Sequence, residues 1–133
     1  MSLLQKISPE WPLRIGTALT YLVSGIDIFQ HPRSWVWAIP GWFKDMVGAV
    51  MPIETYLKIQ AVGEIAMAVA FLLWFIKPKY LKWVALLSAF EMLGILILSP
   101  PSSFVTTTFR DLGLLGGSLT LFLLLYQREK NED

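Results

Sequence analysis

The order of apolar and polar residues along the chain predicts four long hydrophobic helices. Apolar residues dominate four stretches, at about 13–30, 54–76, 81–98 and 109–126. Each stretch has about 18–23 residues, and a helix needs ~20 residues to cross the ~30 Å hydrocarbon layer of a bilayer. The prolines at positions 12, 52, 78, 100 and 101 lie outside these stretches, where they can begin or end helices.

The polar face that a soluble helix needs is missing from parts of these stretches. Residues 66–76 and 119–126 are hydrophobic all round, and such a helix must be buried in protein or in lipid. The alternative is a soluble bundle of long buried helices, but four helices provide too little protein to bury one another. We therefore predict an all-α integral membrane protein, an antiparallel four-helix bundle that forms a single domain over residues 1–133 in the cell membrane.

The segment between the first two stretches predicts a short amphipathic helix on the outer membrane surface. It contains three tryptophans that we expect to form an interfacial lid over the bundle: Trp35, Trp37 and Trp42. After Pro40-Gly41, apolar residues repeat at helical spacing, namely Phe43, Met46, Val47 and Val50, opposite Lys44, Asp45 and Gly48. An irregular loop is the alternative.

Positive charge is distributed unevenly between the two predicted ends of the bundle. One end collects Lys6, Arg14, Lys77, Lys79, Lys82, Arg128 and Lys130, and the other collects Arg33, Lys44, Lys58 and Arg110. Because cytoplasmic loops are enriched in Lys and Arg, we expect both termini in the cytoplasm. Arg14 is expected to extend to that interface.

Composition excludes several classes of function. Charged residues make up only 16% of the chain and the net charge is +1, so no basic stripe is present for nucleic acid. The sequence has no cysteine, which excludes disulfides and thiolate chemistry carried by this chain. Neither a Glu-x-x-His motif nor a Ser-His-Asp set is present, so we expect no metal site and no intrinsic cofactor.

Acidic residues lie inside the hydrophobic stretches. Glu64 and Glu91 each follow the start of their stretch by ten residues, which places both ~15 Å deep. A charge at this depth is costly and normally faces the bundle interior or a water-filled cavity. These acids either hold a proton at neutral pH or meet a cation or a strong hydrogen-bond donor.

A polar seam follows one face of the first stretch: Thr17, Thr20, Ser24, Asp27 and His31. Near the outer end, an ion pair between Asp27 and Arg110 would tie the first and last helices together. Gly113 and Gly117 form a small-xxx-small pair that permits close helix contact.

These residues predict a polar pocket in the outer half of the bundle. Its candidate residues are Asp27, Glu64, Glu91, Arg110, Asp111 and His31. Such a pocket, roofed by the tryptophans, is suited to a quinone head group or to the relay of a proton. The alternative is that these groups only join helices by hydrogen bonds, at about 0.6 kcal/mol each.

Short motifs along nearly the whole chain resemble the DoxX family. They are Arg14, Gly16, the segment from Ser24 to Phe29, His31-Pro32, Trp35, Ile39-Pro40, Trp42, Gly63-Glu64 and the segment from Phe109 to Leu115. The resemblance implies a small four-helix membrane protein in a redox context, because relatives include the DoxD-type subunit of thiosulfate:quinone oxidoreductases. Many relatives have Lys where this chain has Ile28.

Three functions follow as hypotheses. The first is a DoxX-like subunit, at most a non-catalytic or quinone-binding part of an oxidoreductase, that supports quinone-linked or oxidative-stress chemistry with a partner protein. The second is a non-enzymatic scaffold or assembly factor. The third is a small proton-conducting or transport bundle, for which a homo-oligomer would supply more helices.

Overall fold

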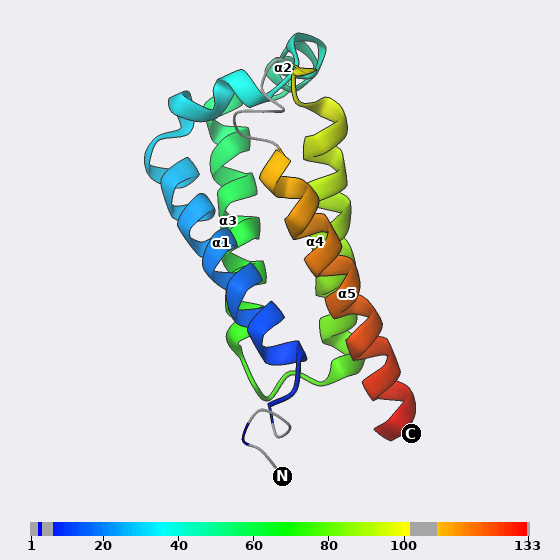
Figure 1. The fold of residues 1–133 in the computed structure, drawn as a ribbon. Helices are drawn as coiled ribbons and strands as arrows, with labels where there is room; N and C mark the ends of the chain where they lie inside the picture. Colours follow the sequence, from blue (N-terminus) through cyan, green and yellow to red (C-terminus); the bar gives the residue numbers. More distant parts are fainter. Residues whose placement is uncertain (1–2, 4–6, 102–108, 133) are drawn as a thin grey trace.

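The computed structural model describes residues 3, 7–101 and 109–132, which are helical with short connections and include no strand. The four long helices are α1 (Glu10–Gln30), α3 (Ile53–Leu72), α4 (Pro78–Leu98) and α5 (Phe109–Glu132). They run side by side, with both termini at one end (Figure 1). The 3₁₀ helix η2 (Pro32–Ala38) and helix α2 (Gly41–Gly48) lie across the other end. The predicted all-α fold is confirmed.

The bounds of the helices differ from the predicted stretches mainly at two ends. Helix α3 ends at Leu72, whereas the hydrophobic stretch continues to Ile76. Helix α5 continues to Glu132, six residues beyond the predicted end at Tyr126. Hydropathy shows which residues can lie in an apolar environment. The ends of a helix depend instead on capping contacts and on charged residues in its last turn.

The four long helices form two tightly packed couples, α1 with α3 and α4 with α5, which contact each other less extensively. The main core lies where the couples meet and includes Tyr21, Phe71, Leu81 and Leu121. A second, smaller core of Ile28, Leu57 and Ala61 lies beneath η2. The interface between the couples therefore holds the main core.

Gly25 allows α1 and α3 to approach closely beside Glu64. A Cβ atom at Gly25 would lie 2.8 Å from Ile65 Cγ1, 3.0 Å from the Ala61 carbonyl oxygen and 3.3 Å from Glu64 Cβ. Because backbone cannot yield as a flexible side chain can, a larger residue would push the helices apart. This contact fixes Glu64 against α1.

Arg14 joins α1 to the end of α3 near the termini, and its partner Glu10 extends this contact to α5. It is 1% exposed, so the prediction that it extends to the interface is wrong. Its Nε and Nη2 atoms donate to the carbonyl oxygens of Phe71 and Leu73, both at 2.7 Å, and its Nη1 donates to Glu10 Oε1 at 3.0 Å. Glu10 also accepts from Arg128 at 3.2 Å. The guanidinium satisfies carbonyls that the end of α3 leaves free.

The outer surfaces of the long helices are strongly apolar. Helices α3 and α4 are long and apolar enough to cross a membrane, yet only 33% and 28% of these segments are buried inside the protein. Large apolar side chains are also exposed on α1 and α5, for example Val23 at 68% and Leu123 at 54%. The core helix of a soluble protein would be covered on these sides. Each long helix therefore presents an uncovered apolar face.

Candidate functional site

Two carboxyl groups meet at the interface between the two couples of helices. Glu64 of α3 and Glu91 of α4 lie on facing helices of the two couples and interact electrostatically. Glu64 is 2% exposed, and Glu91 is partly buried. The Nε2 atom of Gln60 donates to Glu64 Oε1 over a long 3.5 Å. We call Glu64 and Glu91 the acid pair.

The second carboxyl oxygen of Glu64 is an unpaired buried acceptor. Among the described residues, Oε2 has no hydrogen-bond partner. A buried acceptor without a partner costs about 1–3 kcal/mol, so most proteins avoid one unless it has a role. An oxygen in this state can receive a proton or the hydroxyl of a ligand.

The ion pairs formed by described residues lie at the two ends of the bundle, away from the acid pair. Glu10 pairs with Arg14 and Arg128 at one end, where Lys82 also pairs with Glu129. Exposed Arg33 pairs with Glu54 at the other end. Among the described residues, neither Glu64 nor Glu91 forms one of these ion pairs.

Three hydroxyl groups form a buried chain that links α1, α4 and α5. The Oη of Tyr21 lies 2.7 Å from Ser88 Oγ, which lies 2.8 Å from Ser118 Oγ. Ser88 precedes Glu91 by three residues on α4, so this chain lies one helical turn from the acid pair. Sequence analysis did not single out Tyr21 or Ser118. The signal for Tyr21 was its register, because it lies four residues after Thr17 and three before Ser24 in the polar seam.

Asp111 and Arg110 begin α5 near this polar interior. Partly buried Asp111 acts electrostatically on both Glu64 and Tyr21. Arg110 is exposed, and its described charge interaction is with Asp111. Asp111 therefore lies close enough to the acid pair to act on it electrostatically, and Arg110 is exposed beside it.

The expected ion pair between Asp27 and Arg110 is wrong. Asp27 lies in the last turn of α1, and its Oδ2 accepts a hydrogen bond from Trp35 Nε1 at 2.7 Å. The neighbouring lid supplies this donor locally, so Asp27 needs no cation from α5. Its neighbour His31 is exposed, and the His31 backbone N–H ends α1 by donating to the Asp27 carbonyl oxygen.

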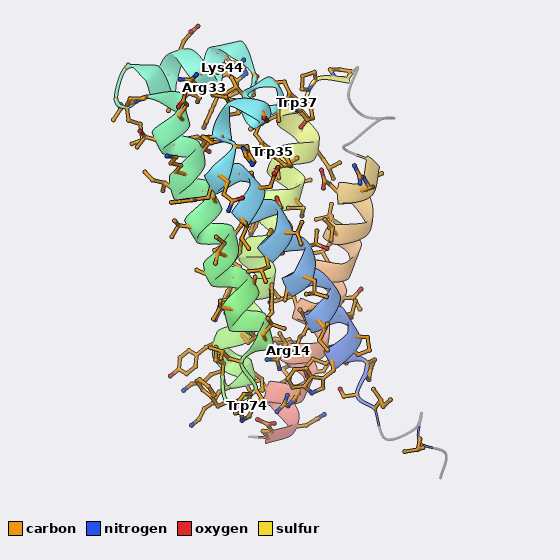
Figure 2. The ribbon with its side chains drawn as sticks, turned by 90° about the vertical axis from the view of Figure 1, so that its left-hand side faces the viewer. Arg14, Arg33, Trp35, Trp37, Lys44 and Trp74 are labelled. Carbon is orange, nitrogen blue, oxygen red and sulfur yellow. The ribbon has the colours of Figure 1, made fainter. Side chains whose placement is uncertain are left out.

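The three lid tryptophans divide into one that packs inward and two that face outward. Trp35 is partly buried and packs on the small core of Ile28, Leu57 and Ala61. Trp37 and Trp42 are 43% and 60% exposed. Figure 2 shows Trp35 lower than Trp37, toward the interior of the bundle. The tryptophan lid thus covers the α1–α3 couple and presents two indoles outward.

The predicted surface helix is present as α2. Its Val47 is buried and its Phe43 ring packs edge-on against Tyr56 at 5.4 Å. Met46 and Val50 remain exposed at 55% and 80%. Some apolar side chains on α2 and in the turn after it therefore pack on the protein, and others face outward.

The glycines of α5 do not make the close helix contact that their spacing predicts. A Cβ atom at Gly113 would meet nothing within 4 Å, and one at Gly117 would meet only Leu13 Cδ2 at 3.8 Å. Both glycines instead line an open groove of about 300 Å³ between α1 and α5. The tight glycine contact of this bundle is at Gly25.

Comparisons with protein-family models, with curated proteins and with solved structures found no match to this chain. The site must therefore be interpreted from its own geometry. That geometry is a buried acid pair with one unpaired oxygen, a hydroxyl chain one turn away, and a tryptophan lid.

Proposed function

We propose that this chain is a DoxX-like integral membrane protein that binds a quinone head group at the acid pair and supports the redox chemistry of a partner protein. In this proposal all four long helices cross the bilayer, and both termini lie in the cytoplasm. The observation that carries the proposal is the unpaired Oε2 of buried Glu64.

The exposed side chains support the membrane placement. Apolar residues cover the outward faces of the long helices, and aromatic residues gather at both ends of the bundle. Trp74, Phe75, Tyr80 and Trp83 are exposed near the α3–α4 connection, and Trp37 and Trp42 near the lid. Aromatic side chains favour the two membrane–water interfaces. A twenty-residue helix such as α3 is ~30 Å long, which matches the hydrocarbon layer between them.

The chemistry of the acid pair supports a quinone as ligand. A quinol hydroxyl can donate to an unpaired carboxylate oxygen, and a protonated carboxyl can donate to a quinone carbonyl. Such a bond to a charged group contributes about 1.5–3 kcal/mol when water is excluded. Because the chain is expected to carry no redox cofactor of its own, electrons would have to come from a partner protein.

Quinone binding by the purified protein in detergent tests the proposal. We expect saturable binding of a ubiquinone or menaquinone analogue, and a roughly tenfold or larger rise in Kd for Glu64→Gln. The matched control is Glu54→Gln, since Glu54 lies on the same helix but pairs with exposed Arg33. Absence of saturable binding by the unaltered protein would refute the ligand. Equal Kd values for Glu64→Gln and the unaltered protein would refute the site.

Co-purification from native membranes tests the partner. We expect an oxidoreductase to be captured with the chain, and its quinone-linked turnover to fall when Glu64→Gln replaces the unaltered protein. Capture of an oxidoreductase whose turnover is insensitive to Glu64→Gln would instead identify the chain as a scaffold.

A further inference from the structure

Lysine side chains from α4 and α5 meet aromatic rings at the end of the bundle that holds the termini. The Lys82 Nζ atom lies 5.4 Å from the centres of the Trp83 and Tyr126 rings. The Lys130 Nζ atom lies 4.9 Å from the centre of the same Tyr126 ring. A cation within about 6 Å of a ring centre is attracted to the face of the ring. These contacts join the start of α4 to the last turns of α5, which lie at the same end of the bundle (Figure 1).

Lys79 extends this cluster along α4. It precedes Lys82 by three residues and Trp83 by four, so the three side chains share one face of the helix. The Lys79 Nζ atom lies 4.8 Å from the centre of the Tyr80 ring. We call these residues the basic–aromatic patch: Lys79, Tyr80, Lys82, Trp83, Tyr126 and Lys130.

The basic–aromatic patch carries an excess of positive charge. Lys82 forms an ion pair with Glu129, whereas exposed Lys79 and Lys130 form no ion pair among the described residues. The other described acids at this end pair with arginines instead. The three lysines therefore face one carboxylate, and two ammonium groups remain available to an anion.

An exposed apolar stripe continues from the patch along α4. Trp83, Leu87 and Phe90 follow one another by four and three residues, which keeps them on one face of the helix, and all three are exposed. On α5, exposed Leu123 lies one turn before Tyr126. A soluble anion would leave these apolar side chains without a contact. A molecule that joins a negative headgroup to hydrocarbon chains matches both the charge and the stripe.

We propose that the basic–aromatic patch binds the headgroup of an anionic phospholipid, whose acyl chains lie along the apolar stripe of α4. The ammonium groups of Lys79 and Lys130 donate to the phosphate oxygens, and the three aromatic rings lie at the boundary between headgroups and hydrocarbon. A zwitterionic headgroup has its own cation beside the phosphate, so the lysines favour an anionic one. The inference rests on the membrane placement in the proposed function but requires no quinone.

Native mass spectrometry of the detergent-purified protein measures this preference. The protein is incubated with phosphatidylglycerol and phosphatidylcholine of identical acyl chains, and the apparent Kd of each lipid is obtained from the bound fractions. We expect phosphatidylglycerol to bind roughly tenfold or more tightly, because each lysine near the headgroups contributes a factor of about five. Equal Kd values for the two lipids would overturn the proposal.

Removal of the two exposed lysines tests whether the lipid binds at the patch. Lys79→Gln/Lys130→Gln keeps the ion pair of Lys82, and we expect its Kd for phosphatidylglycerol to rise about thirtyfold. Lys44→Gln/Lys58→Gln is the matched control, because it removes the same charge near the lid and should leave the Kd unchanged. Lys79→Arg/Lys130→Arg should retain binding, since arginine keeps both charges. An equal rise in both glutamine variants, or lost binding in the arginine variant, would overturn the site.

The soluble headgroup glycerophosphoglycerol tests the contribution of the acyl chains. We expect it to displace phosphatidylglycerol only at about a hundredfold or more higher concentration, because it lacks the chains that contact α4. Displacement at equal concentration would overturn the lipid as ligand.

The outcomes separate this inference from the proposed quinone site. Selective binding of phosphatidylglycerol without quinone binding would refute the quinone and support the lipid site. Quinone binding with equal Kd values for the two lipids would support the quinone and refute the lipid site.

Discussion

At the scale of single residues, the buried polar side chains have two distinct roles. Arg14 satisfies two carbonyls and one carboxylate, so all of its nearby acceptors have a donor. Glu64 has the opposite property, since its own buried Oε2 has no hydrogen-bond partner among the described residues. A fully paired buried group such as Arg14 fits a structural role, whereas an unpaired one such as Glu64 Oε2 requires an explanation, which the proposed ligand provides.

Replacing Arg14 should strongly destabilise the bundle. Arg14→Met leaves Glu10 buried with only Arg128 as partner and removes the donors for Phe71 and Leu73. Removing one member of a buried ion pair costs about 3–5 kcal/mol of unfolding free energy. Chemical denaturation in detergent measures the change. Arg33→Met is the control and should have little effect, because Arg33 is exposed; equal losses for the two variants would contradict a structural role specific to Arg14.

The hydroxyl chain should contribute modestly to stability. Tyr21→Phe removes the phenol that bonds to Ser88 and keeps the ring, so we expect a loss of about 1 kcal/mol. Tyr126→Phe is the matched control, since Tyr126 is 39% exposed and stacks on Phe122 through its ring. Thermal unfolding of both variants checks the difference, and a larger loss in Tyr126→Phe would argue against the buried chain.

The sequence identifies the depth of polar residues but not their partners. Equal distances from the starts of their stretches predicted that Glu64 and Glu91 lie at about the same depth, and the structure has the two acids interacting electrostatically. The same reasoning wrongly paired Asp27 with Arg110. Depth alone does not show that Trp35 of the lid supplies a hydrogen-bond donor to Asp27. Arg14 was placed at the interface because long basic side chains usually extend there, and its carbonyl partners are 57 and 59 residues away in the sequence.

At the scale of helices, close contact depends on one glycine. Gly25→Ala should separate α1 from α3 and cost about 1–3 kcal/mol, because the new methyl group meets backbone and Ile65. Gly63→Ala is the control, since a Cβ there meets nothing within 4 Å. It should be neutral or stabilise α3 by up to about 1 kcal/mol. Denaturation midpoints in detergent give the comparison, and a Gly25→Ala variant as stable as Gly63→Ala would contradict the packing.

Hydropathy predicts the existence of helices better than their ends. The four long helices and α2 lie where the pattern placed them, but η2 was not predicted, because its 3₁₀ turns follow from Pro32 and packing on Ile28 rather than from periodicity. The spacing of Gly113 and Gly117 predicted a close helix contact, but the close contact is at Gly25 instead. A glycine is required only where the backbone of a neighbouring helix packs closely against it, and such contacts depend on the tertiary structure.

At the scale of the whole molecule, the two ends of the bundle should lie on opposite sides of the membrane. The absence of cysteine permits clean labelling of single variants with a membrane-impermeant maleimide. We expect Lys44→Cys, beside the lid, to react in intact cells, and Lys79→Cys, at the other end, to react only after lysis (Figures 1 and 2). The reverse pattern would invert the proposed orientation, and reaction of both in intact cells would refute the spanning arrangement.

The account depends above all on hydrocarbon covering the apolar faces of the long helices. Extraction of cell membranes with alkaline carbonate followed by sedimentation tests this most directly. The account predicts that the chain stays in the membrane pellet and enters solution only with detergent. A chain that appears in the supernatant as a stable monomer without detergent would contradict it.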